Sequence, residues 1–570
     1  MSQKFIVTSA LPYVNGVKHL GNIIGSLLPA DIYARWRRMQ GHDVLAVCGT
    51  DEHGTPCELA ALEEGLPVEE YAAKYYDIQK RIYEQLGLSF DLFGRTSSPQ
   101  NHRITQHLFL RLWENGYITE RTTRQLFCRA CERFLPDRYV IGTCPHCGHP
   151  RARGDQCEEC TKVLDPTDLV EPRCAVCEGS DLEVRESKHL FLDLPKAAPM
   201  VERWIATKTH WPRTTLSIAR KWLKEGLRER CITRDLEWGI PVPLDGYRDK
   251  VFYVWFDAPI GYIGISIEWA EARGEPDLWE HYWKDQSTLL VQFIGKDNVP
   301  FHTVTWPAVL MAADDGFVLA DMVKAFQWLN YEGGKFSTSQ GRGVFSDQAV
   351  ELFPADYWRY YLCLVAPEKG DSDFTWRGFQ AAVNADLANN LGNFVHRTLT
   401  FVNKHWDGVV PEAVGAGEAE EEVREVLARA VRAFDEAMEE CSFQKAVRAM
   451  RDAWQQANVY FDRKQPWHEV KTDKAAAGTT LNTCVHLVRT FAILGSPFIP
   501  FTGRQIYANL ALGGSAETER WDEIENWDEI ENWNRLAGHK IHPRPVPLFK
   551  KIEDAQVAEL QARFAGKGQA

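Results

Sequence analysis

Residues 5–22 read Phe-Ile-Val-Thr-Ser-Ala-Leu-Pro-Tyr-Val-Asn-Gly-Val-Lys-His-Leu-Gly-Asn, an apolar run followed by a polar turn that contains glycine. The run Phe5–Thr8 has the composition of a buried strand, and His19–Met39 carries apolar residues at helical spacing. A second strand-like run, Asp43–Cys48, comes next. Strand, helix and strand in this order predict a parallel sheet with covering helices.

The same pattern returns after a long interruption. A cysteine-rich block occupies residues 125–180, and strand-like runs reappear at Val251–Phe256 and Thr288–Ile294. Further along, four stretches have helical periodicity with few β-branched clusters: Leu387–Val402, Glu421–Glu440, Ser442–Phe461 and Thr479–Leu494. The chain is therefore predicted to be an α/β protein whose parallel sheet is split by an insertion and followed by an α-helical bundle.

Composition excludes several classes of protein. The 570 residues include 65 basic and 79 acidic side chains, giving a formal net charge of −14. That balance excludes a uniformly basic coat for nucleic acid but permits a local basic face. No stretch reaches the roughly 18 apolar residues that a membrane span needs, and the N-terminus has no secretory leader pattern. We therefore expect a cytoplasmic protein with no membrane partner.

Eight of the fourteen cysteines form four Cys-x-x-Cys pairs between residues 128 and 177. Each pair can place two thiolates on one tetrahedral Zn²⁺ ion, so eight thiolates suit two structural ions. Redox chemistry is the alternative, although it usually uses one pair at a helix start. We assign two sets of ligands: Cys144, Cys147, Cys157 and Cys160 for a first zinc ion, and Cys128, Cys131, Cys174 and Cys177 for a second.

Two polar segments are candidates for phosphate binding. His19-Leu20-Gly21-Asn22 follows the first strand and opens a helix, a position where α/β folds bind phosphates. Gly333–Ser339 is a glycine-hinged loop that carries Lys335. Taken alone, each has a simpler interpretation. A histidine at a helix start is often a cap, and a glycine-rich segment is often a surface hairpin.

Together these segments resemble two signatures of the class I aminoacyl-tRNA synthetases. His19–Asn22 resembles the signature written HIGH, and Lys335-Phe336-Ser337-Thr338-Ser339 resembles its partner KMSKS. Over nearly its whole length the chain is similar to the methionyl-tRNA synthetases. The matching stretches are Ala10–Gly16, Cys48–Pro56, Val254–Tyr262, Phe293–Pro307, Gln465–Trp467 and Leu548–Phe564. Asn22, the double zinc knuckle and Asn330–Ser337 resemble the archaeal and eukaryotic-cytosolic branch.

The resemblance implies a reaction and its partners. L-Methionine reacts with ATP and Mg²⁺ to give methionyl-adenylate, and the methionyl group then passes to the 3′ end of tRNA(Met). Positioning and charge stabilisation are the expected means of catalysis. Several relatives continue into a dimerising or tRNA-binding module that this chain does not show, so we expect a monomer.

The resemblance also implies roles for individual residues. It assigns the methionine pocket to Ala10, Leu11, Tyr13, Trp255, Ala258, Pro259, Tyr262, Phe301 and His302, with Asp51 for the ammonium group and Arg234 as its counter-charge. The ATP site comprises His19, Gly21, Asn22, Lys296, Asp297, Lys335 and Thr338. Asn393, Arg397 and Trp467 would read the anticodon. Without the resemblance, the simpler interpretation is that the aromatic residues in these sets are core side chains.

One departure from the family pattern concerns catalysis. Thr338 stands where the family places a second lysine, and we predict that Arg342 partly supplies the missing charge, so that His19, Asn22, Lys335 and Arg342 form the catalytic set. Thr338 also supports a rival function, a non-catalytic RNA-binding or regulatory paralogue. A zinc-ribbon nucleic-acid module is a third possibility, but it explains only the cysteine-rich block.

The predicted fold is thus a split Rossmann-type sheet with a zinc-knuckle insertion and a helical domain. Its expected divisions are residues 1–115 and 231–325 for the two catalytic halves, 116–230 for the insertion, 326–385 for the stem-contact region with the loop, 386–540 for the anticodon-binding domain, and 541–570 for a C-terminal peptide that packs back on the core.

Overall fold

The computed structural model describes residues 2–154, 157, 159–160, 162, 164–337, 340–415, 417–525 and 534–566. Its centre is a parallel five-stranded sheet in the order β14-β13-β1-β2-β3. The strands span Lys4–Ser9 (β1), Asp43–Thr50 (β2), Leu92–Arg95 (β3), Leu289–Gly295 (β13) and Ala320–Phe326 (β14). Because β1 lies between β2 and β13, segments from both sides of the cysteine-rich block share one sheet, which confirms the split α/β fold.

Both faces of the sheet are covered by helices. Along β1, Phe5 and Val7 join the hydrophobic core that contains helix α2, whereas Ile6 joins the core that contains α8. This alternation follows from the two-residue period of a strand. The helix after β1 consists of α1 (Leu20–Asn22), a π-helical turn (Ile23–Leu27) and α2 (Leu28–Met39). Other helices of this part are α3 (Thr55–Glu64), α4 (Val68–Gln85), α5 (Pro99–Glu114), α8 (Val254–Ala272) and α10 (Trp306–Ala313).

The strand expected at Val251–Phe256 is largely wrong. Only Val251–Phe252 (β12) is extended, and it pairs with β11 (Thr233–Arg234) outside the central sheet. Helix α8 begins at Val254, so the aromatic and β-branched residues that suggested a strand form its first turn. The helix is nearly all buried, and packing on β2 and β3 overrides the local preference for strand.

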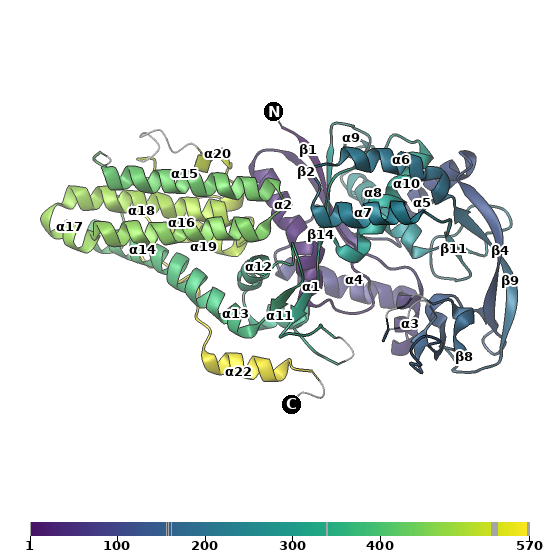
Figure 1. Ribbon diagram of the computed structural model, residues 1–570. Coiled ribbons are helices and arrows are strands. Elements are labelled where there is room, and N and C mark those ends of the chain that lie inside the picture. The colour runs from purple at the N-terminus through teal and green to yellow at the C-terminus, as the bar shows by residue number, and fades with distance from the viewer. Residues whose placement is uncertain are drawn as a thin grey trace.

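The insertion extends from the sheet as a long antiparallel ribbon. Its main strands are β4 (Ile118–Cys128) and β9 (Leu182–Leu192), with β10 (Arg230–Cys231) and β5 (Arg133–Phe134) at the two edges. A second small sheet combines β7 (Ala152–Arg153), β6 (Val140–Thr143) and β8 (Val170–Cys174). Helices α6 (Leu194–Thr207) and α7 (Arg213–Glu225) lie between β9 and β10 along the chain, and they pack against α10 and β14, respectively. Figure 1 shows the ribbon at the end of the molecule opposite the helical bundle.

The second half of the chain is helical, as its periodicity predicts. The long helices are α14 (Asn393–Trp406), α15 (Glu418–Glu439), α16 (Phe443–Lys464), α18 (Lys474–Gly495) and α19 (Pro500–Asn509). Between sheet and bundle lie α11 (Ser346–Leu352), α12 (Ala355–Leu364), α13 (Trp376–Ala381) and a π-helical segment (Ala382–Gly392). The last helix, α22 (Asp554–Arg563), returns to pack beside α13 (Figure 1). No helix of the described residues is long and apolar enough to cross a membrane.

The hexapeptide that begins at Trp521 is repeated at once from Trp527, and this tandem duplication predicts a surface insertion without a function. That interpretation is wrong for the first copy. Trp521 and Ile524 are buried, and the Trp521 ring lies 5.2 Å from that of Phe434. The second copy falls outside the described residues.

Buried charges join the helix after β1 to the helical half of the chain. The Asp31 carboxylate lies 3.0 Å from Arg35 and 2.7 Å from Arg359, and all three side chains are almost fully buried. Arg359 also donates to the carbonyl oxygens of Pro497 and Phe498, each at 2.8 Å. Burial alone would raise the pKa of Asp31, but Arg35 and Arg359 lower it to about 2. The site at the start of this helix is therefore fixed to the bundle through Asp31.

We predict that Asp31→Asn destabilises the protein by about 3–5 kcal/mol, because it leaves two buried guanidinium groups without their full counter-charge. The contribution of Asp31 is present above about pH 4 and is lost as the pH falls toward about 2. Denaturant unfolding at neutral pH measures the effect. The matched control is Glu425→Gln, which removes the exposed pair with Arg429 at the same i,i+4 spacing and should change stability by less than about 0.5 kcal/mol. Equal effects of the two variants would contradict this account of the junction.

Candidate functional site

His19 caps the helix after β1 and is also exposed to a cavity. Its Nδ1 accepts a hydrogen bond from the Gly21 amide at 3.1 Å, and the Asn22 side-chain oxygen accepts from the His19 amide at 3.2 Å. Burial, with a smaller effect from Lys18, lowers the pKa of His19 to about 4. The ring is thus neutral at physiological pH with Nδ1 as an acceptor, so the proton resides on Nε2. The cap and a phosphate donor are compatible roles for this histidine.

A cavity of about 450 Å³ opens at the carboxyl ends of β1 and β13. Ligands bind at this edge of parallel sheets. Eight of the residues predicted for the site line it together: Ala10, Leu11, Tyr13, His19, Gly21, Asn22, Asp297 and Lys335. They come from the segment after β1, the end of β13 and the glycine-hinged loop, so the fold brings together parts of the chain that are far apart in sequence.

Sequence reasoning missed Trp328, which also lines this cavity and is 43% exposed. Its indole Nε1 donates to the Asp297 carboxylate at 3.1 Å. The ammonium of Lys296 lies 3.9 Å from the ring centroid and that of Lys335 lies 5.2 Å from it. Lys296 also pairs with Asp371 at 3.1 Å. Trp328 therefore orders three predicted residues, and its position just before the loop was the only signal in the sequence.

Aromatic side chains from α8 and the segment after β13 meet beside the cavity. The Trp255 and Phe301 rings stack with centroids 3.9 Å apart, and Tyr13 meets Trp255 edge-on at 6.5 Å. Nδ1 of His302 donates to the Asn298 carbonyl at 3.0 Å, which leaves Nε2 as an acceptor. The Tyr262 hydroxyl therefore donates to Nε2 at 2.9 Å. Burial lowers the pKa of His302 to about 4 and keeps it neutral. Ala258 and Pro259 belong to the same turn of α8 as Trp255.

Asp51 is a buried carboxyl group that lacks a full set of partners. Its Oδ1 accepts no hydrogen bond within the described residues. Burial, then the charges of Asp257 and Glu52, raise its pKa well above the usual range, while Lys18 opposes them. A cationic ligand would supply the missing charge. Arg234, on β11, has its guanidinium 3.7 Å from the centroid of the Tyr253 ring and donates to the Thr233 carbonyl at 2.9 Å, and neither contact joins it to Asp51.

Only some residues of the loop after Tyr331 line the cavity. Lys335 and Phe336 line it, whereas Thr338 lies outside the described residues. Arg342 is described but does not line the cavity. Its guanidinium donates to the carbonyl oxygens of Tyr331 and Glu332 at 3.0 and 3.1 Å. In this conformation Arg342 joins the two arms of the loop, and a role in catalysis would require its side chain to turn.

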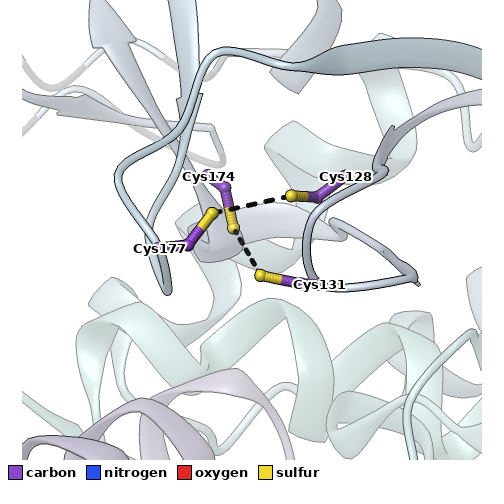
Figure 2. Close-up of side chains that lie close together, drawn as sticks. All are labelled: Cys128, Cys131, Cys174 and Cys177. Atoms are coloured by element: carbon purple, nitrogen blue, oxygen red, sulfur yellow. Dashed lines mark hydrogen bonds between the residues drawn. The ribbon is translucent and has the colours of Figure 1, made fainter.

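The eight paired cysteines form two clusters. One contains Cys128, Cys131, Cys174 and Cys177, and the other contains Cys144, Cys147, Cys157 and Cys160. In the first cluster the Sγ atoms of Cys128 and Cys177 are 3.7 Å apart and those of Cys131 and Cys174 are 3.8 Å apart (Figure 2). Zn–S bonds of about 2.3 Å in a tetrahedron give a sulfur–sulfur separation of about 3.8 Å. Both clusters could therefore hold a zinc ion.

Two of the residues predicted to read an anticodon, Arg397 and Trp467, lie close together in the helical bundle. Arg397, on α14, has its guanidinium 4.4 Å from the Phe461 ring and 5.7 Å from the Trp467 ring, and it pairs with Asp462 at 2.8 Å. Asn393 is exposed one turn earlier on the same helix. A partly exposed tryptophan beside an arginine can stack on and hydrogen-bond to unpaired bases.

Known proteins resemble this chain along its whole length. Residues 5–399 match the family described as tRNA synthetases class I (M), and residues 410–569 match the anticodon binding domain of methionyl tRNA ligase. The methionine–tRNA ligase of Streptomyces avermitilis is 50% identical, with 99% of each chain covered. Methionine–tRNA ligase 1 of Acaryochloris marina is 48% identical over 99% of this chain and 100% of the relative.

A solved structure agrees with these matches. The methionyl-tRNA synthetase of Mycobacterium tuberculosis, in complex with methionyl-adenylate, has a TM-score of 0.78 and 26% sequence identity, covering 96% of this chain and all of that one. The similarity spans the sheet, the insertion and the bundle. It therefore favours an enzyme over the two alternatives, a non-catalytic RNA-binding paralogue and a zinc-ribbon module.

Proposed function

The chain belongs to the class I methionyl-tRNA synthetases, and from that premise we propose which of its residues activate L-methionine with ATP and charge tRNA(Met). One observation carries the assignment. His19, Asn22, Asp297 and Lys335 line a single cavity, and the stacked Trp255 and Phe301 lie beside it. A polar, positively charged cavity next to an aromatic pocket suits a nucleotide and a thioether side chain.

Methionine would bind with its side chain among the aromatic rings and its ammonium group at Asp51. The thioether is polarizable and packs well on aromatic surfaces. The ammonium would supply the charge that the buried Asp51 carboxyl lacks, adding to the smaller effect of Lys18. Arg234 stays the predicted counter-charge of this carboxyl. We assign Ala10, Leu11, Tyr262 and His302 to the walls of this pocket, with the Tyr262–His302 hydrogen bond fixing their orientation.

ATP would lie over Gly21, with its phosphates at His19 and Asn22. The neutral His19 ring would donate to a phosphate oxygen from Nε2. The side-chain oxygen of Asn22 accepts from the His19 amide, so the side-chain amino group of Asn22 would donate to the phosphates. Mg²⁺ carried by ATP shares the phosphate charge. The methionine carboxylate attacks the α-phosphate, pyrophosphate leaves, and the tRNA ribose hydroxyl then attacks the acyl carbon and releases AMP. Lys335 supplies charge where it develops on the phosphates.

Two finer assignments rest on the cysteine clusters and on Asn22. We propose that each cluster holds one structural zinc ion, with no open coordination position. We also propose that the chain represents the archaeal and eukaryotic-like form of the family in a bacterial setting. The four cysteine pairs support this, and the relatives named above show that the family occurs in bacteria. A cytoplasmic monomer that reads the anticodon with Asn393, Arg397 and Trp467 completes the proposal.

Zinc content tests the two clusters separately. We expect two zinc ions per chain in the parent, and one in either Cys157→Ser or Cys174→Ser, because each substitution removes a ligand from one cluster only. Atomic absorption on purified protein measures this. Cys441→Ala is the matched control, since it removes a buried single thiol and should leave two ions bound. A parent with fewer than two ions would contradict the proposal.

Anticodon reading is tested at Trp467. We expect Trp467→Ala to lower the rate of tRNA(Met) charging by about 10- to 100-fold, as loss of one base stack does, and to leave ATP–pyrophosphate exchange unchanged. Trp406→Ala is the control, because Trp406 is also partly buried in the same domain with a lysine 5.5 Å from its ring. Equal charging by Trp467→Ala and the parent would exclude the assignment.

Two variants test the consequence of having Thr338 where the family has a lysine. We predict that Thr338→Lys accelerates methionine activation, and that Arg342→Ala slows it by up to about 10²-fold while methionine affinity changes little. Pre-steady-state adenylate formation measures both rates. No gain in rate from Thr338→Lys would mean that another residue already compensates for the missing lysine. An unchanged rate in Arg342→Ala would show that Arg342 supports the structure of the loop and takes no part in activation.

A further inference from the structure

The ring of Phe336 lies flat against the ring of His19. The two centroids are 4.5 Å apart and the planes are inclined by only 7°. Phe336 directly follows Lys335, so the loop residue that stacks on His19 is the neighbour of the loop residue that carries the charge. An apolar ring on this face excludes water from the imidazole, and burial is the main reason that the pKa of His19 falls to about 4.

Phe336 also packs closely against Gly343. This glycine has φ +96°, and a Cβ atom built on it would collide with the Phe336 ring. The segment after Gly343 is itself bonded to the segment around His19: the Leu20 amide donates to the Val344 carbonyl at 3.2 Å, and the Ser346 amide donates to the Lys18 carbonyl at 2.8 Å. Phe336 therefore contacts both the histidine and a glycine whose segment is bonded to the segment around that histidine.

The C-terminal peptide, described here for residues 541–566, contacts the loop that carries Phe336. The Gly343 amide donates to the Phe564 carbonyl at 3.1 Å, and the Phe564 ring stacks on Trp376 at 5.8 Å. Gln561 donates to the Glu332 carboxylate at 3.3 Å. The peptide thus contacts both arms of the loop, the arm before Lys335 through Glu332 and the arm after it through Gly343.

We propose that Phe336 is a positioning residue for His19, and that the C-terminal peptide holds Phe336 in place through Gly343. The proposal rests on the assignment of His19 to the ATP phosphates. Stacking fixes the plane of the imidazole, so that Nε2 points to one place in the cavity while Nδ1 keeps its bond to Gly21. A small misplacement of such a donor can cost about 100-fold in rate.

Phe336→Ala tests the stack. We expect kcat for methionine-dependent ATP–pyrophosphate exchange to fall by about 10- to 100-fold, with the KM for methionine unchanged, because Phe336 lies beside the phosphate end of the cavity. Phe336→Tyr retains a flat ring and should recover most of the rate. Phe336→Leu retains bulk without a flat ring and should not.

The pH profile separates positioning of His19 from a general loss of structure. Removal of the ring exposes His19, so its pKa should rise from about 4 toward its ordinary value near 6.5. Protonation then removes the Nδ1 acceptor, and exchange by Phe336→Ala should fall as the pH drops through about 6.5. The parent should show no such limb. Lys18 and Lys335 face the same cavity and oppose protonation, whereas Asp297 favours it.

The C-terminal support is tested by Phe564→Ala. It should lower exchange in the same way and speed tryptic cleavage after Lys335. In the double variant with Phe336→Ala, the loss should not exceed that of Phe336→Ala alone, because both act through one ring. Phe401→Ala is the control: it removes a phenylalanine–histidine ring contact at 4.6 Å in the helical domain and should leave exchange unchanged.

The outcomes separate this proposal from the proposed function. A parent that shows no methionine-dependent exchange would overturn the function itself. A parent that exchanges normally, with Phe336→Ala equal to it in rate and pH profile, would overturn only the role of Phe336. Additive losses in the double variant would show that the C-terminal peptide acts independently of Phe336, and would overturn the second half of the proposal.

Discussion

The buried carboxylate of Asp31 holds the helix from Leu20 to Met39 against the rest of the chain. Its two guanidinium partners come from α2 itself and from α12, and Arg359 extends the contact to the turn between α18 and α19. Charges in such an interior are stable only in one arrangement, since each loses its solvation and depends on the others. The start of the same helix carries His19, Gly21 and Asn22. One continuous helical segment therefore connects the cavity that we propose for ATP to the helical domain.

Two of the residues that we propose to bind the substrates, Asp51 and His19, have shifted pKa values of opposite direction. Asp51 is a carboxyl group in a dry environment with other carboxyl groups beside it, so it gains most when a cation arrives. The pKa of His19, in contrast, is lowered, so its ring stays neutral. A neutral ring can donate to an anion without repelling the neighbouring lysines. Both groups are thus oriented before the substrates bind. Preorganised groups stabilise a charge that develops during phosphoryl transfer without having to reorient during the reaction.

Periodicity was sufficient to predict the parallel sheet, the helix after β1 and the long helices of the second half, because these elements are buried on regular faces. It failed at Val251–Phe256, where packing on the sheet favours helix, and at Trp521, whose repeat suggested an exposed insertion. The cysteine sets could be proposed from spacing and metal geometry. Trp328 and the direction of the Arg342 side chain could not, because both depend on how loops distant in sequence meet. The domain boundaries stay a prediction.

The central claim is that this cavity activates methionine in particular. ATP–pyrophosphate exchange with purified protein, Mg²⁺ and each of the twenty amino acids tests it most directly, because the assay requires both the aromatic pocket and the phosphate site but no tRNA. The account predicts exchange with methionine alone, at a rate that Thr338 limits without abolishing. Exchange with another amino acid, or with none while tRNA(Met) is still bound, would contradict it.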